Sequence, residues 1–251
     1  MTTSATPPSR SVGNQQPPKV QRRDNVLTEL YRSALGKKYL MAISGLVLMA
    51  YVLIHMIGNF KLFEGEASLN EYAIWLRELG EPLIPEYGAI WATRVILILA
   101  FGVHIIAAAQ LTRMNQISRG RSRYAERHYA AVDFAGRTMR WTGVIVGLFV
   151  IYHLADLTWG VQAVNPEWEY LEVYNNVVAS FANPVSAAVY IVANAALGVH
   201  LYHGAWSLFQ SMGWNSPRFN HWRRWFAIGF ALLIAVGNIS MPVAVQLGLV
   251  G

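Results

Sequence analysis

Four histidines lie deep inside long apolar stretches of this sequence, one in each of four stretches: His55, His104, His153 and His200. Each could be a metal ligand, a proton carrier or a hydrogen-bonded core residue. An unpartnered polar group in hydrocarbon costs several kcal/mol, so ionisable side chains there are usually functional. At about 1.5 Å per residue, His104 and His200 lie roughly 13 to 15 Å from one end of their stretches, and His153 and His55 roughly 20 to 24 Å. The four side chains are therefore expected at two levels, two at each.

The residues around these histidines repeat in the same two groups. Gly-Val-His occurs at 102–104 and at 198–200, and an aromatic-Val-x-x-His segment occurs at 51–55 and at 149–153. Two imidazoles at one depth can bind one iron from both faces of a porphyrin, provided that small residues leave room for the macrocycle. Such residues, which plain helix packing would also use, lie along all four stretches: Gly45, Ala50, Gly58, Gly102, Ala107, Ala108, Ala109, Gly143, Gly147, Ala193, Ala195, Ala196, Gly198 and Gly204. The pattern predicts two haems, one between His55 and His153 and one between His104 and His200.

The lack of cysteine narrows this chemistry. A chain with no Cys holds no disulfide, no cysteine-ligated zinc, no iron–sulfur cluster of its own and no haem attached through Cys-x-x-Cys-His. Both haems are therefore expected to be non-covalent, b-type groups. Bis-histidine ligation leaves no open position on the iron, which predicts electron transfer and not oxygen binding. Zinc or copper is the alternative, but no carboxylate or thiol accompanies the four histidines at metal-ligand spacing.

Further polar side chains are candidates for contacts with these groups. His203 is expected to bond a haem propionate, although it could also replace His200 as ligand. Arg94 needs an anion if it is buried, which a propionate or a quinone oxygen would supply; alternatively it reaches the interface beside Trp91. Four basic residues near the opposite end could meet propionates or serve membrane topology alone: Arg32, Lys37, Arg137 and Arg140. His128 and His221 are expected to be solvated surface residues.

Five long apolar stretches must position these side chains. The chain has 251 residues, of which 54% are hydrophobic and 14% charged, a balance too apolar for an ordinary soluble domain. Each stretch is near the roughly 20 residues that cross about 30 Å of hydrocarbon. They cover residues 39–60, 89–112, 141–159, 184–209 and 225–247. Asp156 interrupts the third near its end, where an interfacial position would accommodate the carboxylate. The sequence predicts an all-α integral membrane bundle of five transmembrane helices.

Basic residues gather on one side of these stretches. Seventeen of the twenty Lys and Arg residues lie in 1–38, 113–140 and 210–224, whereas the other two connections carry acidic clusters. By the positive-inside rule, the N-terminus and the basic loops are expected in the cytoplasm and the C-terminus outside. Topology thus accounts for the net charge of +6, so anionic lipid or a docked protein is expected as a partner and nucleic acid is not. The predicted organisation is a disordered tail, an interfacial helix and a five-helix haem-binding domain, over residues 1–24, 25–38 and 39–251.

Several segments resemble a known family, the five-helix cytochrome b subunit of succinate dehydrogenases and fumarate reductases with a single dihaem anchor polypeptide. The resemblance covers about residues 33–247 and rests on four segments. They are Ser33-Ala34-Leu35-Gly36-Lys37-Lys38, Met41-Ala42-Ile43-Ser44-Gly45-Leu46, His55-Met56-Ile57-Gly58-Asn59, and His200-x-x-x-Gly204-Ala205-Trp206-Ser207 followed by Gly213. The resemblance implies that His55 and His153 bind the outer haem and that His104 and His200 bind the inner one. Relatives often carry Asn in the place of His203, which favours His200 as the ligand.

The resemblance also implies partners and a reaction. A flavoprotein subunit with FAD and an iron–sulfur subunit would dock on the cytoplasmic face of the inner (cytoplasmic) membrane. Electrons from succinate would pass through the clusters and the two haems to a quinone, either menaquinone or ubiquinone, and the dicarboxylate site would lie on a partner. The complex would serve the tricarboxylic acid cycle and the respiratory chain. Gly198 stands where some fumarate-reducing members place a glutamate, which favours the direction of succinate oxidation.

Two other interpretations remain open. The anchor of another quinone-linked enzyme, such as a formate dehydrogenase or a hydrogenase, would share the histidines and differ in its protein partners. A non-redox transporter would use the histidines to relay protons, and it should show paired broken helices or inverted repeats. The sequence singles out no quinone pocket, and the acidic candidates all lie in the first outer loop: Glu64, Glu66, Glu71 and Glu78.

Overall fold

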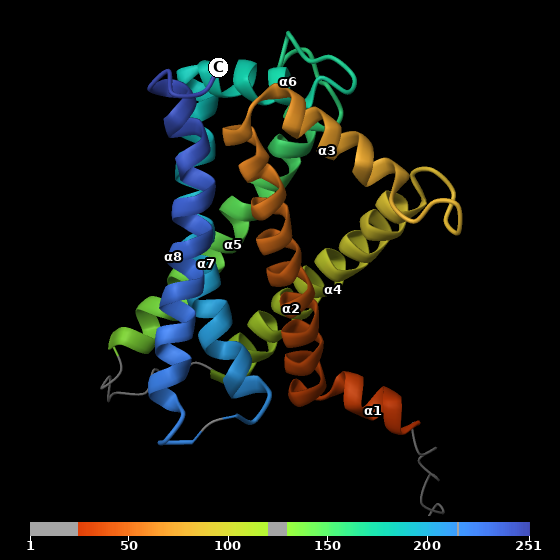
Figure 1. The fold of residues 1–251 in the computed structure, drawn as a ribbon. Coiled ribbons are helices and arrows are strands. Elements are labelled where there is room, and N and C mark those ends of the chain that lie inside the picture. The colour runs from red at the N-terminus through yellow and green to blue at the C-terminus, as the bar shows by residue number, and fades with distance from the viewer. Residues whose placement is uncertain (1–24, 120–129, 215) are drawn as a thin grey trace, which may run out of the picture.

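The described part of the chain is built from helices. The structure, a computed structural model, describes residues 25–119, 130–214 and 216–251 (Figure 1). Within these residues there are eight α-helices, one short 3₁₀ helix and no strand. In chain order they are α1 (Val26–Arg32), α2 (Ala34–Asn59), η1 (Phe60–Glu64), α3 (Glu66–Glu78), α4 (Gly88–Arg119), α5 (Ala130–Leu157), α6 (Val173–Ala182), α7 (Pro184–Ser211) and α8 (Asn220–Gln246). The predicted all-α fold is confirmed.

Five of these helices are long and apolar enough to cross a membrane: α2 continued by η1, α4, α5, α7 and α8. They cover the five predicted stretches and extend beyond most of them, except that α5 ends at Leu157, two residues before the predicted limit, and α8 at Gln246, one residue before it. At about 1.5 Å per residue, helices of 26 to 32 residues measure roughly 40 to 48 Å, more than the hydrocarbon thickness of about 30 Å. The polar flanks therefore continue the helices beyond the apolar stretches.

The two ends of the bundle carry different elements. Figure 1 shows α1 and the first turns of α2, α5 and α8 at one end, called here the α1 end. The C-terminus, α3 and α6 lie at the other, called here the α6 end. With an odd number of long helices between them, α1 and the C-terminus lie at opposite ends. Which end faces the cytoplasm stays a prediction from the basic loops.

Helices α7 and α8 form the core of the bundle. Both are more buried than α2, α4 or α5, and their contact is the most extensive of the helix pairs in the described residues. Small residues permit this, because a Cβ added to Gly198 on α7 would meet Ala235 on α8. A Cβ added to Gly237 on α8 would meet Met56, so this glycine permits the approach of α2. Around this core, α2 packs on α4, and α5 packs on α7. Within the described residues, neither α2 with α5 nor α4 with α7 is a closely packed pair.

The short helices α3 and α6 close the α6 end. Asn70 on α3 accepts a hydrogen bond from the backbone N–H of Tyr174 at 3.0 Å, which ties α3 to the start of α6. Gln246 at the end of α8 donates to the carbonyl of Phe181 at 2.7 Å, which ties α8 to the end of α6. In consequence α6 lies over the ends of α5, α7 and α8.

The interfacial segment predicted for residues 25–38 divides into two helices. Between α1 and α2 the chain bends at Ser33, whose Oγ accepts from the backbone N–H of Gly36 at 2.9 Å and so caps α2. Only α1 is separate from the first long helix. The predicted disordered tail lies outside the described residues.

Candidate functional site

The four predicted histidines meet in two pairs. The ring centres of His55 on α2 and His153 on α5 lie 5.8 Å apart, with their planes at 81°. The ring centres of His104 on α4 and His200 on α7 lie 6.3 Å apart, with their planes at 68°. These are the combinations expected from depth along the helices. They are called here the α2–α5 pair and the α4–α7 pair.

Both separations suit two imidazoles that bind one metal ion from opposite sides. A metal–imidazole bond is about 2 Å long, and the ring centre lies about 1 Å beyond the nitrogen, which puts two such centres roughly 6 Å apart. Among the described residues, no group of three or more His, Cys, Asp or Glu side chains could hold an ion alone. A metal between either pair would need ligands from a non-protein group, such as the four nitrogens of a porphyrin.

Two hydroxyl groups hold the Nδ1 atoms of the α4–α7 pair. Ser44 Oγ lies 3.3 Å from His104 Nδ1, and Thr142 Oγ1 lies 3.4 Å from His200 Nδ1. Each hydroxyl donates its own proton to the backbone carbonyl four residues earlier, at 2.7 and 2.8 Å. The hydroxyl oxygen can then accept the Nδ1–H of the ring. That tautomer presents a lone pair on Nε2, as a metal ligand requires.

The α2–α5 pair is held in a comparable way. Tyr190 OH lies 3.3 Å from His153 Nδ1 and donates to Asp156 Oδ2 at 2.7 Å, so the phenol oxygen can accept from the ring. The side-chain amide nitrogen of Asn59, Nδ2, lies 3.0 Å from His55 Nδ1. Exchange of the amide nitrogen and oxygen by a flip of the side chain would place an acceptor there instead. In His104, His153 and His200, the hydroxyl oxygen at Nδ1 is compatible with an Nε2 available to a metal, and in His55 the flipped amide of Asn59 would be.

Glycines of α2 and α5 make room for the α4–α7 pair. A Cβ added to Gly45 would lie 3.3 Å from His104 Cε1, and one added to Gly143 would lie 3.4 Å from His200 Cε1. Both imidazoles therefore rest against the helix backbone itself. A side chain larger than hydrogen would press on the ring or displace it.

Open space is also present along the same helices. A Cβ added to Gly102 on α4 or Gly147 on α5 would meet no heavy atom of the described residues within 4 Å. All four histidines are half-buried, and each pair bridges two helices that are not closely packed. The residues present thus fit a planar macrocycle at each pair.

Sequence analysis missed Ser44 and Thr142, although a signal for them exists. Met-x-x-Ser-Gly occurs at 41–45 and Met-x-x-Thr-Gly at 139–143, and in each case the glycine precedes the histidine of the same helix by ten residues. The similarity between α2 and α5 therefore extends over about four turns. In both helices, the hydroxyl and the glycine contact a histidine of the other pair.

His203 and Arg94 contact other protein groups. His203 Nε2 lies 3.2 Å from Thr138 Oγ1 on α5. The guanidinium of Arg94 lies 4.9 Å from the ring centre of Trp91 and is exposed. Arg94 thus makes the contact with Trp91 that the sequence offered as its alternative. Roles at a propionate or a quinone stay predictions for both residues.

The other predicted basic residues lie near the α1 end. Lys37 is buried, and its Nζ donates to the carbonyl of Tyr31 at 2.7 Å while lying 4.8 Å from the ring centre of that residue. This cation therefore holds the corner between α1 and α2. Arg32 and Arg140 are exposed, and the side chain of Arg137 lies outside the described part of the chain. Their predicted contacts with propionates stay predictions.

A buried carboxylate lies beside the α2–α5 pair. Asp156 is near the end of α5, where the sequence predicts an interfacial position, but its side chain is fully buried. Ser180 on α6 and Tyr190 on α7 both donate to its Oδ2 at 2.7 Å. Ser186 extends this cluster from Ser180 to Tyr152. The cluster links α5, α6 and α7, and the hydroxyl group of Tyr190 connects it to His153.

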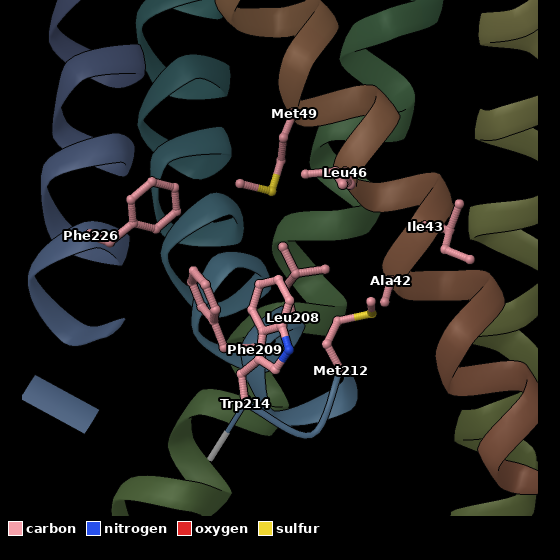
Figure 2. A pocket seen from close by; sticks show the side chains of 9 residues that line it. All are labelled: Ala42, Ile43, Leu46, Met49, Leu208, Phe209, Met212, Trp214 and Phe226. Atoms are coloured by element: carbon pink, nitrogen blue, oxygen red, sulfur yellow. The ribbon is translucent and has the colours of Figure 1, made fainter. Parts of the chain in front are cut away.

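Two cavities lie at opposite ends of the bundle. Figure 2 shows the cavity at the α1 end, between α2, α7 and α8, lined by apolar and aromatic side chains: Ala42, Ile43, Leu46, Met49, Leu208, Phe209, Met212, Trp214 and Phe226. A shallow cavity at the α6 end has a mixed lining of charged, hydroxyl and aromatic groups: Lys61, Ser68, Glu71, Tyr72 and Trp75. The cavity at the α1 end suits an apolar hydrocarbon chain. Of the two, the second holds groups able to exchange protons.

No protein-family model, no curated protein and no solved structure matches this chain. Its function must therefore follow from the arrangement of its own residues. The arrangement at issue is two histidine pairs at two depths of a five-helix membrane protein.

Proposed function

We propose that this chain is the dihaem cytochrome b anchor of a succinate:quinone oxidoreductase in the cytoplasmic membrane. The observation that carries the proposal is the meeting of four histidines in two pairs, at ring separations of 5.8 and 6.3 Å. A bis-histidine haem has no open iron position, so it carries electrons and does not bind oxygen. The resemblance of residues 33–247 to the dihaem anchors specifies the succinate-linked complex.

Each part of the site would have a separate task. His55 and His153 would hold one haem, and His104 and His200 the other. The Nδ1 partners would keep the rings in the ligating tautomer, because neighbours of a metal-bound imidazole set its orientation and basicity. The glycines would leave room for the macrocycles. When bound, the two haems supply one-electron transfer across the membrane.

The spacing of the two pairs suits transfer across the bilayer. His200 contacts Gly143 of α5, and His153 follows ten residues later on the same helix. At about 1.5 Å per residue, the two pairs are separated by roughly 15 Å along α5. One pair would serve a partner at the α1 end and the other a quinone toward the α6 end.

The two ends of the bundle suit different partners. Seventeen of the twenty Lys and Arg residues lie in segments assigned to the α1 end, which favours the cytoplasmic side and a flavoprotein with an iron–sulfur subunit docked there. Of the acidic candidates for the quinone, Glu71 lines the cavity at the α6 end together with Tyr72 and Trp75. A quinone pocket needs such an aromatic wall and a group that exchanges protons.

The test is a haem-to-protein ratio on the membrane complex purified through this chain, together with its reduced-minus-oxidised spectrum. Two low-spin b-type haems per chain are expected. A preparation without haem would overturn the proposal. The subunits that co-purify show which enzyme complex contains this chain. A flavoprotein together with clusters that succinate reduces would support the succinate-linked complex. Subunits that oxidise formate or hydrogen would show that the chain anchors another quinone-linked enzyme.

A further inference from the structure

We infer that Asp156 is a positioning residue for the α2–α5 pair: acting through Tyr190, it holds His153 in its ligating state and lowers the midpoint potential of the haem bound there. The inference rests on the proposed function, because it requires a haem between His55 and His153. It is supported by a directed hydrogen-bond chain, by the fixed position of Tyr190 and by the burial of the Asp156 carboxyl group.

The hydrogen-bond chain runs from the carboxylate to the ligand. Tyr190 OH lies 2.7 Å from Asp156 Oδ2 and 3.3 Å from His153 Nδ1. Ser180 Oγ donates to the same Oδ2 at 2.7 Å. Because Tyr190 donates its proton to Asp156, the phenol oxygen is left to accept from Nδ1–H. Asp156 thus sets the direction of the whole chain, and with it the tautomer of His153.

Tyr190 is held so that its hydroxyl cannot turn away. Its ring is buried between Phe149, at 5.1 Å and 89°, and Phe181, at 4.7 Å and 70°. Both are edge-to-face contacts, which aromatic pairs favour. The phenol is therefore a rigid link between the carboxylate on α5 and the histidine one turn earlier on the same helix.

The carboxylate itself is costly where it lies. Asp156 is fully buried, and its Oδ1 has no hydrogen-bond partner among the residues that the structure describes. A buried charge that is not fully hydrogen-bonded destabilises a protein, and a neutral side chain could join α5 to α6 at a smaller cost. A cationic iron beyond His153 would offset this charge. This arrangement is expected of a group that acts on the metal site.

The α4–α7 pair lacks this device. Ser44 and Thr142 donate hydrogen bonds to neutral backbone carbonyls, whereas Tyr190 donates to a carboxylate. A carboxylate behind the N–H of a ligand makes the imidazole a stronger electron donor and favours the oxidised metal. Asp156 therefore makes the two haem sites chemically unequal.

The experiment is a redox titration of the purified complex, followed at the haem absorption bands, for Asp156→Asn, Tyr190→Phe and the double variant. Tyr152→Phe is the matched control, because its hydroxyl donates to Ser186 at 3.1 Å in the same cluster, away from Asp156. Each single variant is expected to raise the midpoint potential of the haem at the α2–α5 pair and leave the other haem unchanged. The double variant should equal the larger single effect, because Asp156 acts through Tyr190.

The outcomes separate this inference from the proposed function. A wild-type complex without haem would overturn both. Two haems whose potentials stay unchanged in Asp156→Asn and Tyr190→Phe would overturn the inference alone, as would an equal shift in Tyr152→Phe. Should Asp156→Asn fail to assemble, Tyr190→Phe keeps the ring in place and decides the question. Additive shifts in the double variant would show that Asp156 acts without Tyr190.

Discussion

At the residue scale, the histidines depend on the neighbours that hold their Nδ1 atoms. The hydroxyl groups of Ser44, Thr142 and Tyr190 each donate a hydrogen bond to another oxygen. Each hydroxyl oxygen can then accept a hydrogen bond from an imidazole. This common arrangement arises from three different residue types on three different helices. It would prepare each ring for a metal before the metal arrives, which reduces the reorganisation that binding requires.

Removal of one histidine is predicted to remove one particular haem. Replacing His104 or His200 by Ala should leave only the haem of the α2–α5 pair, and replacing His55 or His153 should leave only that of the α4–α7 pair. Each loss follows because a single imidazole cannot hold iron from both faces. The haem-to-protein ratio and the low-temperature spectrum of each variant measure this. Loss of the same haem from all four variants would refute the pairing.

Removal of the Thr142 hydroxyl is predicted to loosen the haem at the α4–α7 pair. Thr142→Val keeps the shape but removes the acceptor for His200 Nδ1, and such changes typically weaken a metal site by about tenfold or more. Haem loss to a scavenging apoprotein measures the effect. Thr93→Val is the control, because Thr93 makes the same bond to a backbone carbonyl but lies exposed on α4. Equal haem loss from both variants would contradict the role of Thr142.

At the element scale, the path of each helix determines which histidine ring lies against its backbone. Helix α2 presents Gly45 to His104, and α5 presents Gly143 to His200. Each glycine lies about three turns from the histidine of its own helix, so each helix would serve both haem levels. The helices α7 and α8 supply the packed core against which these contacts are held.

A β-branched side chain at Gly45 is predicted to displace His104. The Cβ position is already 3.3 Å from the ring, so Gly45→Val would overpack the contact, at a typical cost of about 1–3 kcal/mol. The haem of the α4–α7 pair should be lost while the other remains, as judged by the spectrum. Gly229→Val on α8 serves as control, because that position meets no described atom within 4 Å. Retention of both haems in Gly45→Val would show that the contact does not matter.

At the scale of the whole molecule, the five long apolar helices place α1 and the C-terminus at opposite ends, and the basic segments predict that the α1 end faces the cytoplasm. The chain has no cysteine, so single cysteines can report the orientation. Gly251→Cys is expected to react with a membrane-impermeant maleimide in intact cells, and Thr28→Cys only after permeabilisation. The cysteine-free parent is the control. Labelling of Thr28→Cys alone in intact cells would reverse the proposed topology.

The cavity at the α6 end provides a test of quinone access at the same scale. Glu71→Gln is predicted to lower quinone reduction by the complex without changing its haem content, because Glu71 lines that cavity and a carboxyl group can exchange protons. Glu78→Gln is the control, because Glu78 is the last residue of α3 and does not line that cavity. Unchanged turnover in Glu71→Gln would exclude this cavity as the site of quinone chemistry.

The sequence alone determined the number of long helices, their approximate limits and the depths of the four histidines. Length and apolar composition are local properties, and depth follows from a constant rise per residue. For the same reason, His55 could be matched with His153, and His104 with His200, before the helices were placed in space. Asp156 shows where this reasoning fails, because its position near a helix end predicts an interface, whereas α6 buries it.

Only the tertiary structure decided which atoms face the Nδ1 side of each ring, which glycines touch an imidazole and how Asp156 reaches His153 through Tyr190. These contacts join residues that are 34 to 60 positions apart in the chain. They depend on the rotation of each helix about its axis and on the angle at which it crosses its neighbours. Neither quantity is contained in the local pattern of a single helix, because both are set by the packing of all the helices together.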